Sequence, residues 1–239
     1  MSRKCLETTP GRLSLESFLS AHASEGLTLE IGAEDSECAR WFPNRVAINI
    51  RRNEHVDVMA DAYRLPFGDE AFDVVLCAEV LEHLHTPSVA LAEMRRVLKP
   101  EGKLLLTTPF AYPIHYAPTD YYRYTRYGLL HLLADWEVES LTEATTDGAA
   151  LATFFHHWLL KKKGVAWKAP KLAWWCVWRA LTRSYRGGMK RAGTNGNTHM
   201  PGGYLVAARK RAAALSDAHE AAAREPALRS VVEETGARV

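Results

Sequence analysis

The sequence has few cysteines and no long apolar run. Its four cysteines, among 239 residues, lie far apart, and none belongs to a Cys-x-x-Cys pair. This spacing gives no zinc or disulfide pattern, so we expect no metal site and a reducing, cytoplasmic setting. Apolar runs such as Leu172–Val177 are much shorter than the roughly 20 residues of a membrane span. The opening MSRKCLETTP leads into no apolar stretch, so no signal peptide is expected.

Acidic residues are missing from one long segment of the chain. Residues 148–216 contain 13 Lys and Arg but no Asp or Glu, whereas residues 1–147 contain 14 Lys and Arg against 23 Asp and Glu. The net charge of +2 therefore conceals an acidic body that carries one basic segment. The apolar fraction of 47% is that of an ordinary globular protein, so the body is expected to fold around a core.

Predicted strands and helices alternate along the acidic body. The strands, recognised as short apolar runs between turn residues, are expected at residues 27–32, 45–50, 56–60, 72–77, 103–108, 138–144 and 203–209. Helices are expected at residues 11–22 and 126–136, and a third follows the N-cap Thr86 with Pro87 and ends at Lys99-Pro100-Glu101-Gly102. The alternation predicts an α/β fold with a parallel sheet and helices on both faces.

Small or polar residues stand at the carboxyl ends of four of these strands. In an open α/β sheet, ligands bind beyond these ends. The residues concerned are Glu30-Ile31-Gly32, Asn49, Asp61-Ala62 and Cys77-Ala78-Glu79. Each of these residues, taken alone, is explained as an ordinary turn or helix-cap residue. Together they suit an adenosyl ligand lying across the sheet. Asn49 would reach ribose hydroxyls and Asp61 the adenine amino group.

Two stretches carry a family resemblance. Residues 61–84 read DAYRLPFGDEAFDVVLCAEVLEHL, and residues 95–109 read RRVLKPEGKLLLTTP. From about residue 27 to 145 the chain resembles the class I S-adenosylmethionine-dependent methyltransferases, in their type 11 small-molecule branch. The resemblance implies a Rossmann-like seven-stranded sheet, mostly parallel, with the last strand antiparallel. It also implies S-adenosylmethionine as cofactor, in a site formed by Glu30, Gly32, Ala33, Glu34, Asn49, Asp61, Ala62, Cys77, Ala78 and Glu79.

The loop after Gly32 departs from the family's usual pattern. The family usually has a second glycine where this chain has Glu34, and Asp or Glu where it has Asn49. A side chain at Glu34 restricts the backbone, and the Asn49 amide lacks the charge of a carboxylate. Because the cofactor carries a sulfonium and an ammonium that a carboxylate favours, methyl transfer stays the first prediction. The alternative is a non-catalytic or weakly active protein with a degenerate cofactor loop.

A second motif, PFAYPIHYAPTDYYRYT at residues 109–125, resembles a segment of some of these enzymes written H-x-x-P-x-D-x-x-R-Y-T. The resemblance places it over the cofactor's methyl group, where it shapes the acceptor pocket. His115 is the candidate base for an oxygen acceptor, and His83, Tyr122 and Arg123 are candidate substrate-binding residues. Alternatively, Asp120 and Arg123 form a structural ion pair on one helical turn, and Thr125 caps the next helix.

The basic segment, residues 148–200, contains five tryptophans among its lysines and arginines. It is interpreted as a helical insertion that packs on the core, rests on an anionic membrane, or binds nucleic acid. Nucleic acid is disfavoured because no nucleic-acid-binding motif accompanies the charge. The adjacent His156 and His157 point apart on a helix and do not suggest a shared metal.

The predicted organisation is a methyltransferase domain at 1–147 and 201–211, the insertion at 148–200, and an Ala- and Glu-rich, partly disordered tail at 212–239. The expected acceptor is a small molecule, a sugar or a lipid-linked compound, with phosphate or carboxylate groups that suit the basic segment. A dinucleotide oxidoreductase is disfavoured because GxGxxG is absent. An RNA-modifying enzyme remains an alternative, which rests only on the positive charge of the basic segment.

Overall fold

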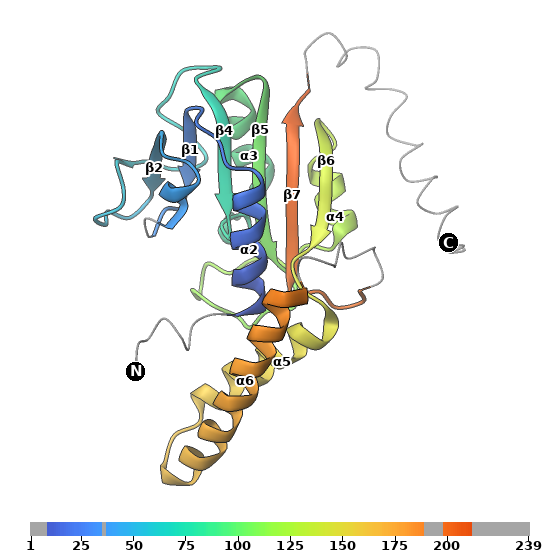
Figure 1. Ribbon diagram of the computed structural model, residues 1–239. Helices are drawn as coiled ribbons and strands as arrows, with labels where there is room; N and C mark the ends of the chain where they lie inside the picture. Colours follow the sequence, from blue (N-terminus) through green and yellow to red (C-terminus); the bar gives the residue numbers. More distant parts are fainter. Residues whose placement is uncertain (1–8, 35–36, 189–197, 212–239) are drawn as a thin grey trace.

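The computed structural model describes residues 9–34, 37–188 and 198–211, and within them the chain forms one seven-stranded sheet (Figure 1). The strand order is β3-β2-β1-β4-β5-β7-β6. The strands are β1 (Thr28–Ile31), β2 (Arg45–Asn49), β3 (Val58–Met59), β4 (Phe72–Ala78), β5 (Leu98–Pro109), β6 (Trp136–Glu143) and β7 (Gly203–Lys210). Strands β1 to β5 pair in parallel, and β7 is antiparallel to both β5 and β6. The predicted sheet, including its antiparallel last strand, is confirmed.

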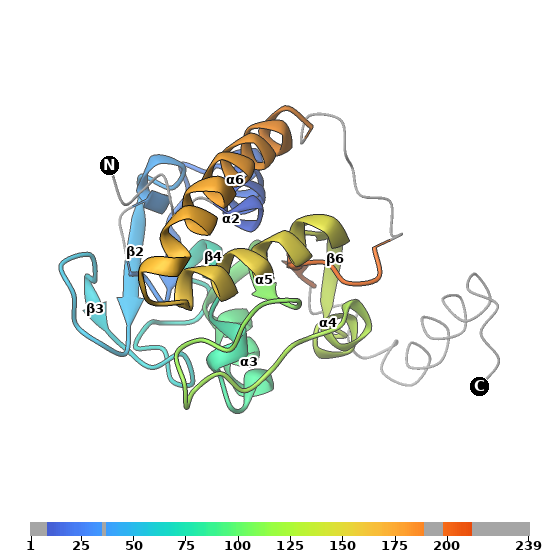
Figure 2. The same ribbon diagram turned by 90° about the horizontal axis from the view of Figure 1, so that it is seen from below.

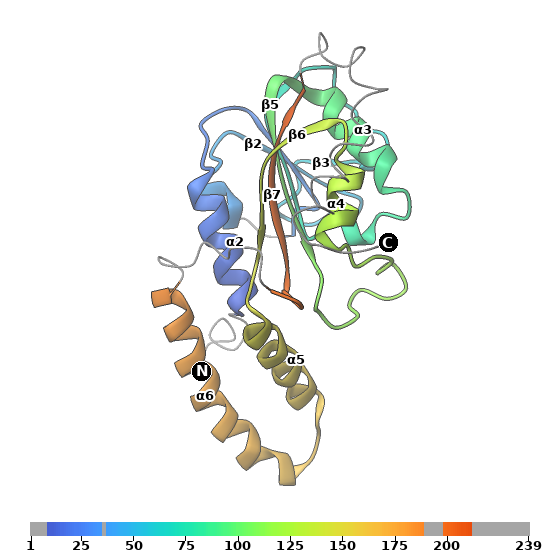
Figure 3. The ribbon, with the colours of Figure 1, turned by 90° about the vertical axis from the view of Figure 1, so that its right-hand side faces the viewer.

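Helices cover both faces of the sheet (Figure 3). The α-helices are α2 (Pro10–Ala21), α3 (Pro87–Val97), α4 (Arg126–Leu132), α5 (Asp147–Lys161) and α6 (Lys168–Gly188). Three short 3-10 helices, η1 (Glu37–Arg40), η2 (Leu81–His83) and η3 (Val165–Trp167), lie in the connections. Helix α2 packs on one face, and α3 and α4 pack on the other, so the central strands are buried on both sides.

Threonine side chains begin several of these helices. Thr9, Thr125 and Thr146 each accept a hydrogen bond from a backbone N–H in the first turn of α2, α4 and α5. The same role was predicted for Thr86, but its hydroxyl makes no capping bond and instead pairs with His85 Nδ1 at 2.7 Å. Pro87 still occupies the first turn of α3, where its missing N–H costs nothing.

Strands β3, β5 and β6 and helix α4 differ from the predicted ranges. The helix expected at residues 126–136 ends at Leu132, and β6 already begins at Trp136. Strand β5 begins at Leu98, where residues 103–108 were expected, because Leu98 pairs with Phe72 before an irregularity in the ladder at Phe72–Val74. Glu101, one of the residues predicted to end the preceding helix, lies within β5 and has a φ of 61°. Strand β3 is only two residues long, since it pairs with β2 over just two positions at the edge of the sheet.

Helices α5 and α6 form a hairpin, residues 147–188, that projects beyond the carboxyl ends of β4 and β5 (Figures 1 and 2). It occupies most of the segment predicted as a helical insertion, although the division into domain and insertion stays a prediction. Helix α2 contacts both helices of the hairpin. Among the described helices, none combines the length and apolar character needed to cross a membrane. The predicted tail at 212–239 lies outside the described residues.

Candidate cofactor and acceptor site

The strand register brings the predicted cofactor residues to one edge of the sheet. Ile31, the last residue of β1, pairs with Ile48 of β2 and with Cys77 of β4. Gly32, Asn49 and Ala78 therefore follow at the same level on three neighbouring strands. Asp61 and Ala62 come just after β3, which pairs with β2 at Asn49. The predicted carboxyl-edge arrangement is thus present, although no ligand contact follows from it alone.

Gly32 makes the sharp turn that leaves β1. Its φ is 81°, a region that disfavours side chains, and a Cβ atom there would lie 2.3 Å from Val80 Cγ2. The backbone N–H groups of Gly32 and Ala33 both donate to the Ile48 carbonyl, at 2.8 and 3.0 Å. Glycine is therefore required here by conformation and by space.

The Asn49 side chain holds the loop together. Its Nδ2 donates to the Ala33 carbonyl at 3.0 Å, and its Oδ1 accepts from the Arg51 backbone N–H at 3.0 Å. Asn53 Nδ2 donates to the same Ala33 carbonyl at 3.0 Å. An amide can make both kinds of bond, whereas a carboxylate could not donate to Ala33. These bonds explain why an asparagine suits position 49, which the sequence alone did not suggest.

Two predicted cofactor residues direct their side chains into the protein. The Glu30 carboxylate forms an ion pair with Arg45, and the residue is only 7% exposed. Cys77 is fully buried in the core, and burial strongly raises the pKa of its thiol. Cys77 can therefore meet a ligand only through its backbone, and the charge of Glu30 is already balanced.

Glu79 and Asp61 present carboxyl groups at the edge. Glu79 has a φ of 54°, and its Oε1 accepts a hydrogen bond from Thr107 Oγ1 at 2.9 Å. Loss of hydration, followed by the negative charge of Glu82, raises the pKa of the Glu79 carboxyl group. Asp61 is exposed, and its Oδ1 accepts from the Tyr63 backbone N–H at 3.0 Å.

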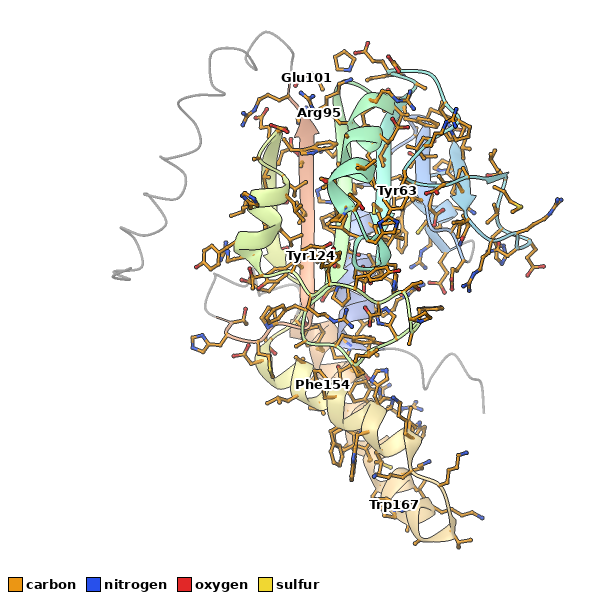
Figure 4. All side chains as sticks on the ribbon, turned by 180° about the vertical axis from the view of Figure 1, so that it is seen from behind. Tyr63, Arg95, Glu101, Tyr124, Phe154 and Trp167 are labelled. Carbon is orange, nitrogen blue, oxygen red and sulfur yellow. The ribbon has the colours of Figure 1, made fainter. Side chains whose placement is uncertain are left out.

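The segment that follows β5, residues 110–125, lies over this edge without regular structure, and we call it the acceptor segment after its predicted role. Tyr124, labelled in Figure 4, is 8% exposed and anchors the end of the segment by donating from its hydroxyl to the Leu81 carbonyl. Tyr116 Oη donates to Glu34 Oε2 at 3.0 Å, so Glu34 joins the cofactor loop to the acceptor segment. Tyr122 Oη donates to the His85 carbonyl at 2.9 Å.

Asp120 and Arg123 form the predicted ion pair, with Arg123 Nη2 2.7 Å from Asp120 Oδ2. They lie in irregular backbone, so the predicted helical turn is wrong. The ion pair holds this stretch of backbone in place without a helix. Arg123 adds a hydrogen bond to the Tyr122 carbonyl at 2.8 Å. The Arg123 guanidinium lowers the pKa of the Asp120 carboxyl group. Thr125 caps α4 by accepting from Gly128, as predicted.

His115 lies between two carboxylates. Its Nδ1 is 3.3 Å from Asp120 Oδ2, and its Nε2 is 3.6 Å from Glu82 Oε1. The Glu82 carboxylate, and then Asp120, raise the pKa of the imidazole against the effect of burial. The His83 ring lies 4.8 Å from the His115 ring, centroid to centroid. The predicted catalytic residue and the predicted substrate residue His83 are therefore neighbours.

Sequence reasoning did not single out Glu82, although it is the second glutamate of the EVLEH stretch. It is fully buried, and among the described residues its Oε1 has no hydrogen-bond partner. Its neighbour His83 stands in η2, the short 3-10 helix that precedes α3. Tyr112 was also missed; its Oη lies 3.2 Å from His157 Nε2 and joins the acceptor segment to the hairpin.

A separate cavity of about 720 Å³ opens between α2, the hairpin and β7. Its lining includes Phe18, Trp178, Leu181, Tyr185 and Leu205, and is mostly apolar. None of the strand-end residues described above borders it. The cavity is therefore distinct from the candidate cofactor site.

The strand order is that of the fold expected for a class I methyltransferase. Residues 29–106 match the family model Methyltransf_11, described as a methyltransferase domain. This part of the chain is therefore similar to the methyltransferase domain family that the sequence resemblance predicted.

Curated relatives match over a short stretch. The ubiquinone/menaquinone biosynthesis C-methyltransferase UbiE of Paraburkholderia phytofirmans is 53% identical over 49 residues, 20% of this chain and 20% of that protein. The demethylmenaquinone methyltransferase of Renibacterium salmoninarum is 45% identical over 64 residues, 26% of this chain and 27% of that protein. The chain thus spans about a fifth to a quarter of the length of these relatives.

Solved structures share the fold over most of the chain. The Burkholderia thailandensis 1,6-didemethyltoxoflavin-N1-methyltransferase, solved with bound 1,6-didemethyltoxoflavin and S-adenosylhomocysteine, superposes with a TM-score of 0.55. The match is 13% identical and covers 86% of this chain and 80% of that one. At this identity it supports the fold alone.

Proposed function

We propose that this protein transfers a methyl group from S-adenosylmethionine to a small-molecule acceptor, with oxygen as the accepting atom. The observation that carries the proposal is His115, held between Glu82 and Asp120 beside the carboxyl edge of a methyltransferase sheet. The bound cofactor supplies a methyl group that its sulfonium charge already activates. The protein then has to bind and align the acceptor, exclude water and accept a proton.

The proposed cofactor site is the set of strand-end residues Gly32, Ala33, Glu34, Asn49, Asp61, Ala62, Ala78 and Glu79, with Glu30 and Cys77 behind them. The chemistry of this set fits the ligand, because the cofactor's ammonium and sulfonium are cations and the edge offers the Glu34, Asp61 and Glu79 carboxyl groups.

His115 is the proposed base. A proton leaving an acceptor hydroxyl would move to His115 Nε2, and the imidazolium formed would be stabilised by Glu82 and Asp120 on its two sides. Asp120 is in turn held by Arg123, so the ring has a fixed neighbour on its Nδ1 side. His83 and Tyr122 are proposed to border the acceptor, while Arg123 acts mainly by positioning Asp120.

Carbon is the competing acceptor atom. The two curated relatives named above are quinone-pathway methyltransferases, and one is named as a C-methyltransferase. A carbon acceptor made nucleophilic by a neighbouring hydroxyl would also need a base, so His115 serves both chemistries. Mass spectrometry of the product from a phenolic acceptor separates them, because an O-methyl group is lost by ether cleavage and a C-methyl group is not.

The second part of the proposal is that the hairpin contacts an anionic membrane, which presents a lipid-linked acceptor. Its far end exposes Val165 and Leu172 by 77% and 67%, beside Lys161, Lys162 and Lys163 (Trp167 marks this end in Figure 4). Apolar side chains rimmed by lysines suit a headgroup surface of negative charge. The hairpin also meets the acceptor segment through His157 and Tyr112. An anionic or saccharide-containing soluble acceptor would use the same basic rim.

Calorimetry with S-adenosylmethionine tests the function. We expect wild-type binding that Asp61→Ala weakens at least tenfold, about 1.4 kcal/mol, while the exposed Asp135→Ala leaves it unchanged. His115→Ala should abolish turnover and keep cofactor affinity within about threefold, because the cofactor residues lie on other strand ends. No binding at millimolar ligand would instead favour the alternative of a non-catalytic protein with a degenerate loop.

A further inference from the structure

Glu82, His83 and His115 bring three metal-ligating side chains together from two parts of the chain. The ligand atoms of these three residues all lie within 4.8 Å of one another. Glu82 Oε1 is 3.7 Å from His83 Nε2 and 3.6 Å from His115 Nε2. A tetrahedral zinc ion with bonds of about 2.0–2.1 Å separates its ligand atoms by about 3.4 Å. The two measured separations are close to that value.

The other ring nitrogen of each histidine faces an oxygen atom, although only that of His83 makes a hydrogen bond within the described residues. His83 Nδ1 donates to the Thr119 carbonyl at 2.8 Å, which leaves the lone pair of Nε2 directed to the cluster. His115 Nδ1 lies 3.3 Å from Asp120 Oδ2, and Arg123 holds that carboxylate from the other side. A carbonyl or carboxylate behind each imidazole is the usual outer support of a metal site.

The buried carboxylate is the second, independent observation. Glu82 is fully buried, and its Oε1 has no hydrogen-bond partner among the described residues. Its other oxygen has one long contact, 3.5 Å from Thr108 Oγ1. A buried carboxylate oxygen without a partner is costly, and a bound dication would balance its charge. The nearby Glu79 carboxyl is engaged by Thr107 and is not needed as a ligand.

We propose that Glu82, His83 and His115 form a site for one divalent transition-metal ion of the zinc class. Two imidazoles and one carboxylate favour zinc, cobalt or iron over magnesium and calcium, which prefer oxygen ligands. The side chains of His83 and His115 are 19% and 23% exposed, so the ion has a path from solvent and an open coordination position. The proposal departs from our expectation, drawn from cysteine spacing, that the chain has no metal site.

The site goes beyond the proposed methyl transfer and does not depend on it. His115 Nε2 is both the proposed proton acceptor and the proposed metal ligand, so an ion and a proton exclude each other there. In the loaded protein, the ion would lower the pKa of an acceptor hydroxyl bound at the open position, and the released proton would pass to solvent water rather than to His115. The test therefore measures metal binding without cofactor or acceptor, so it can fail or succeed independently of the methylation assay.

The experiment uses the full chain without a polyhistidine tag, stripped with a chelator and then dialysed against Zn²⁺ or Co²⁺. Elemental analysis should find one equivalent of bound metal, and Co²⁺ should give the visible absorption of a site of low coordination number. Glu82→Gln and His115→Ala should each weaken Zn²⁺ binding at least tenfold. Asp120→Asn, which acts through His115, should weaken it about tenfold.

The matched control is His131→Ala, because His131 is an exposed histidine on α4 outside the cluster. It should keep one equivalent of metal. Zn²⁺ should raise the melting temperature of the wild type and of His131→Ala but not of Glu82→Gln, whose metal-free form should be at least as stable as the wild type. Less than half an equivalent of bound metal, or binding that survives Glu82→Gln and His115→Ala alike, would overturn the site.

Discussion

The sheet and the hairpin use large apolar side chains in opposite ways. In the sheet, Leu76, Leu105 and Val206 are completely buried between the covering helices. In the hairpin, Trp158 and Leu172 are 47% and 67% exposed. Charge divides along the same line, since the part of the sequence that holds the hairpin has no acidic residue between 148 and 216. The fold's stability thus resides in the sheet, and much of the hairpin's apolar surface is left for contact with something else.

The base of the hairpin is an exception to this contrast. Trp178 is 2% exposed and stacks on the buried His156 with ring centroids 4.1 Å apart. Trp174 Nε1 donates to His156 Nδ1 at 3.1 Å. The boundary between the two regions therefore runs through the hairpin and not at its first residue.

The largest expected effect tests that boundary. Trp178→Ala should cost about 3–5 kcal/mol of unfolding free energy, as for other buried aromatic residues, measured by urea denaturation. The matched change Trp158→Ala, at an exposed site on the same hairpin, should cost less than about 1 kcal/mol. Equal losses would mean that the whole hairpin belongs to the core and that the contrast is wrong.

A somewhat smaller effect is expected when the hairpin's lysines are neutralised. Replacing Lys161, Lys162 and Lys163 by Gln should weaken sedimentation with anionic vesicles by about 3 kcal/mol, roughly 1 kcal/mol per lysine. Salt should release the wild-type protein, because the attraction is screened. Vesicles of neutral lipid are the control, and equal binding to both lipids by wild type and variant would leave core packing as the hairpin's role.

A third prediction concerns the sheet's own edge. Gly32→Ala should destabilise the protein by about 2–3 kcal/mol, because it combines a left-handed backbone with a Cβ 2.3 Å from Val80. It should also weaken S-adenosylmethionine binding at least tenfold. Gly148→Ala is the matched control on the hairpin, where an added Cβ meets nothing within 4 Å. Thermal melting and calorimetry on both variants separate loop geometry from a general effect of the added methyl group.

The smallest expected effect is that of Glu34→Gly. The change frees the backbone but removes the hydrogen bond from Tyr116, so we expect cofactor affinity to stay equal or rise by less than about threefold. Calorimetry measures it. A tenfold loss would instead make Glu34 a ligand-contacting carboxylate in its own right.

Most of the fold was predictable because it follows from local patterns. The apolar run Val74–Ala78 and the proline of α3 identify a buried strand and a helix start without any long-range information. The antiparallel β7 followed from the family resemblance alone, since nothing local distinguishes it from a parallel strand. The extended start of β5 could not be foreseen, because it depends on pairing between Leu98 and Phe72.

The position of the site at the strand ends was predictable from the sequence, but the contacts between its side chains were not. The order of residues places Gly32 and Asn49 at one edge, yet gives no sign that Asn49 donates to Ala33. His115 approaches Glu82 because of the path of an irregular segment, and no periodic pattern in the sequence predicts that path. Side-chain clusters formed by loops are decided by tertiary contacts, and sequence patterns report only the elements that carry them.

The position of β7 has a consequence for the order in which the protein folds. Strand β6 has β7 as its pairing partner, and β7 lies between β5 and β6 although it comes after the hairpin in sequence. Lys103 pairs with Arg209, about a hundred residues further along the chain. Closing so long a loop is slow in comparison with local contacts. We therefore expect β1 to β5 to assemble first, with β6 docking only when the chain returns from the hairpin and β7 fills the gap.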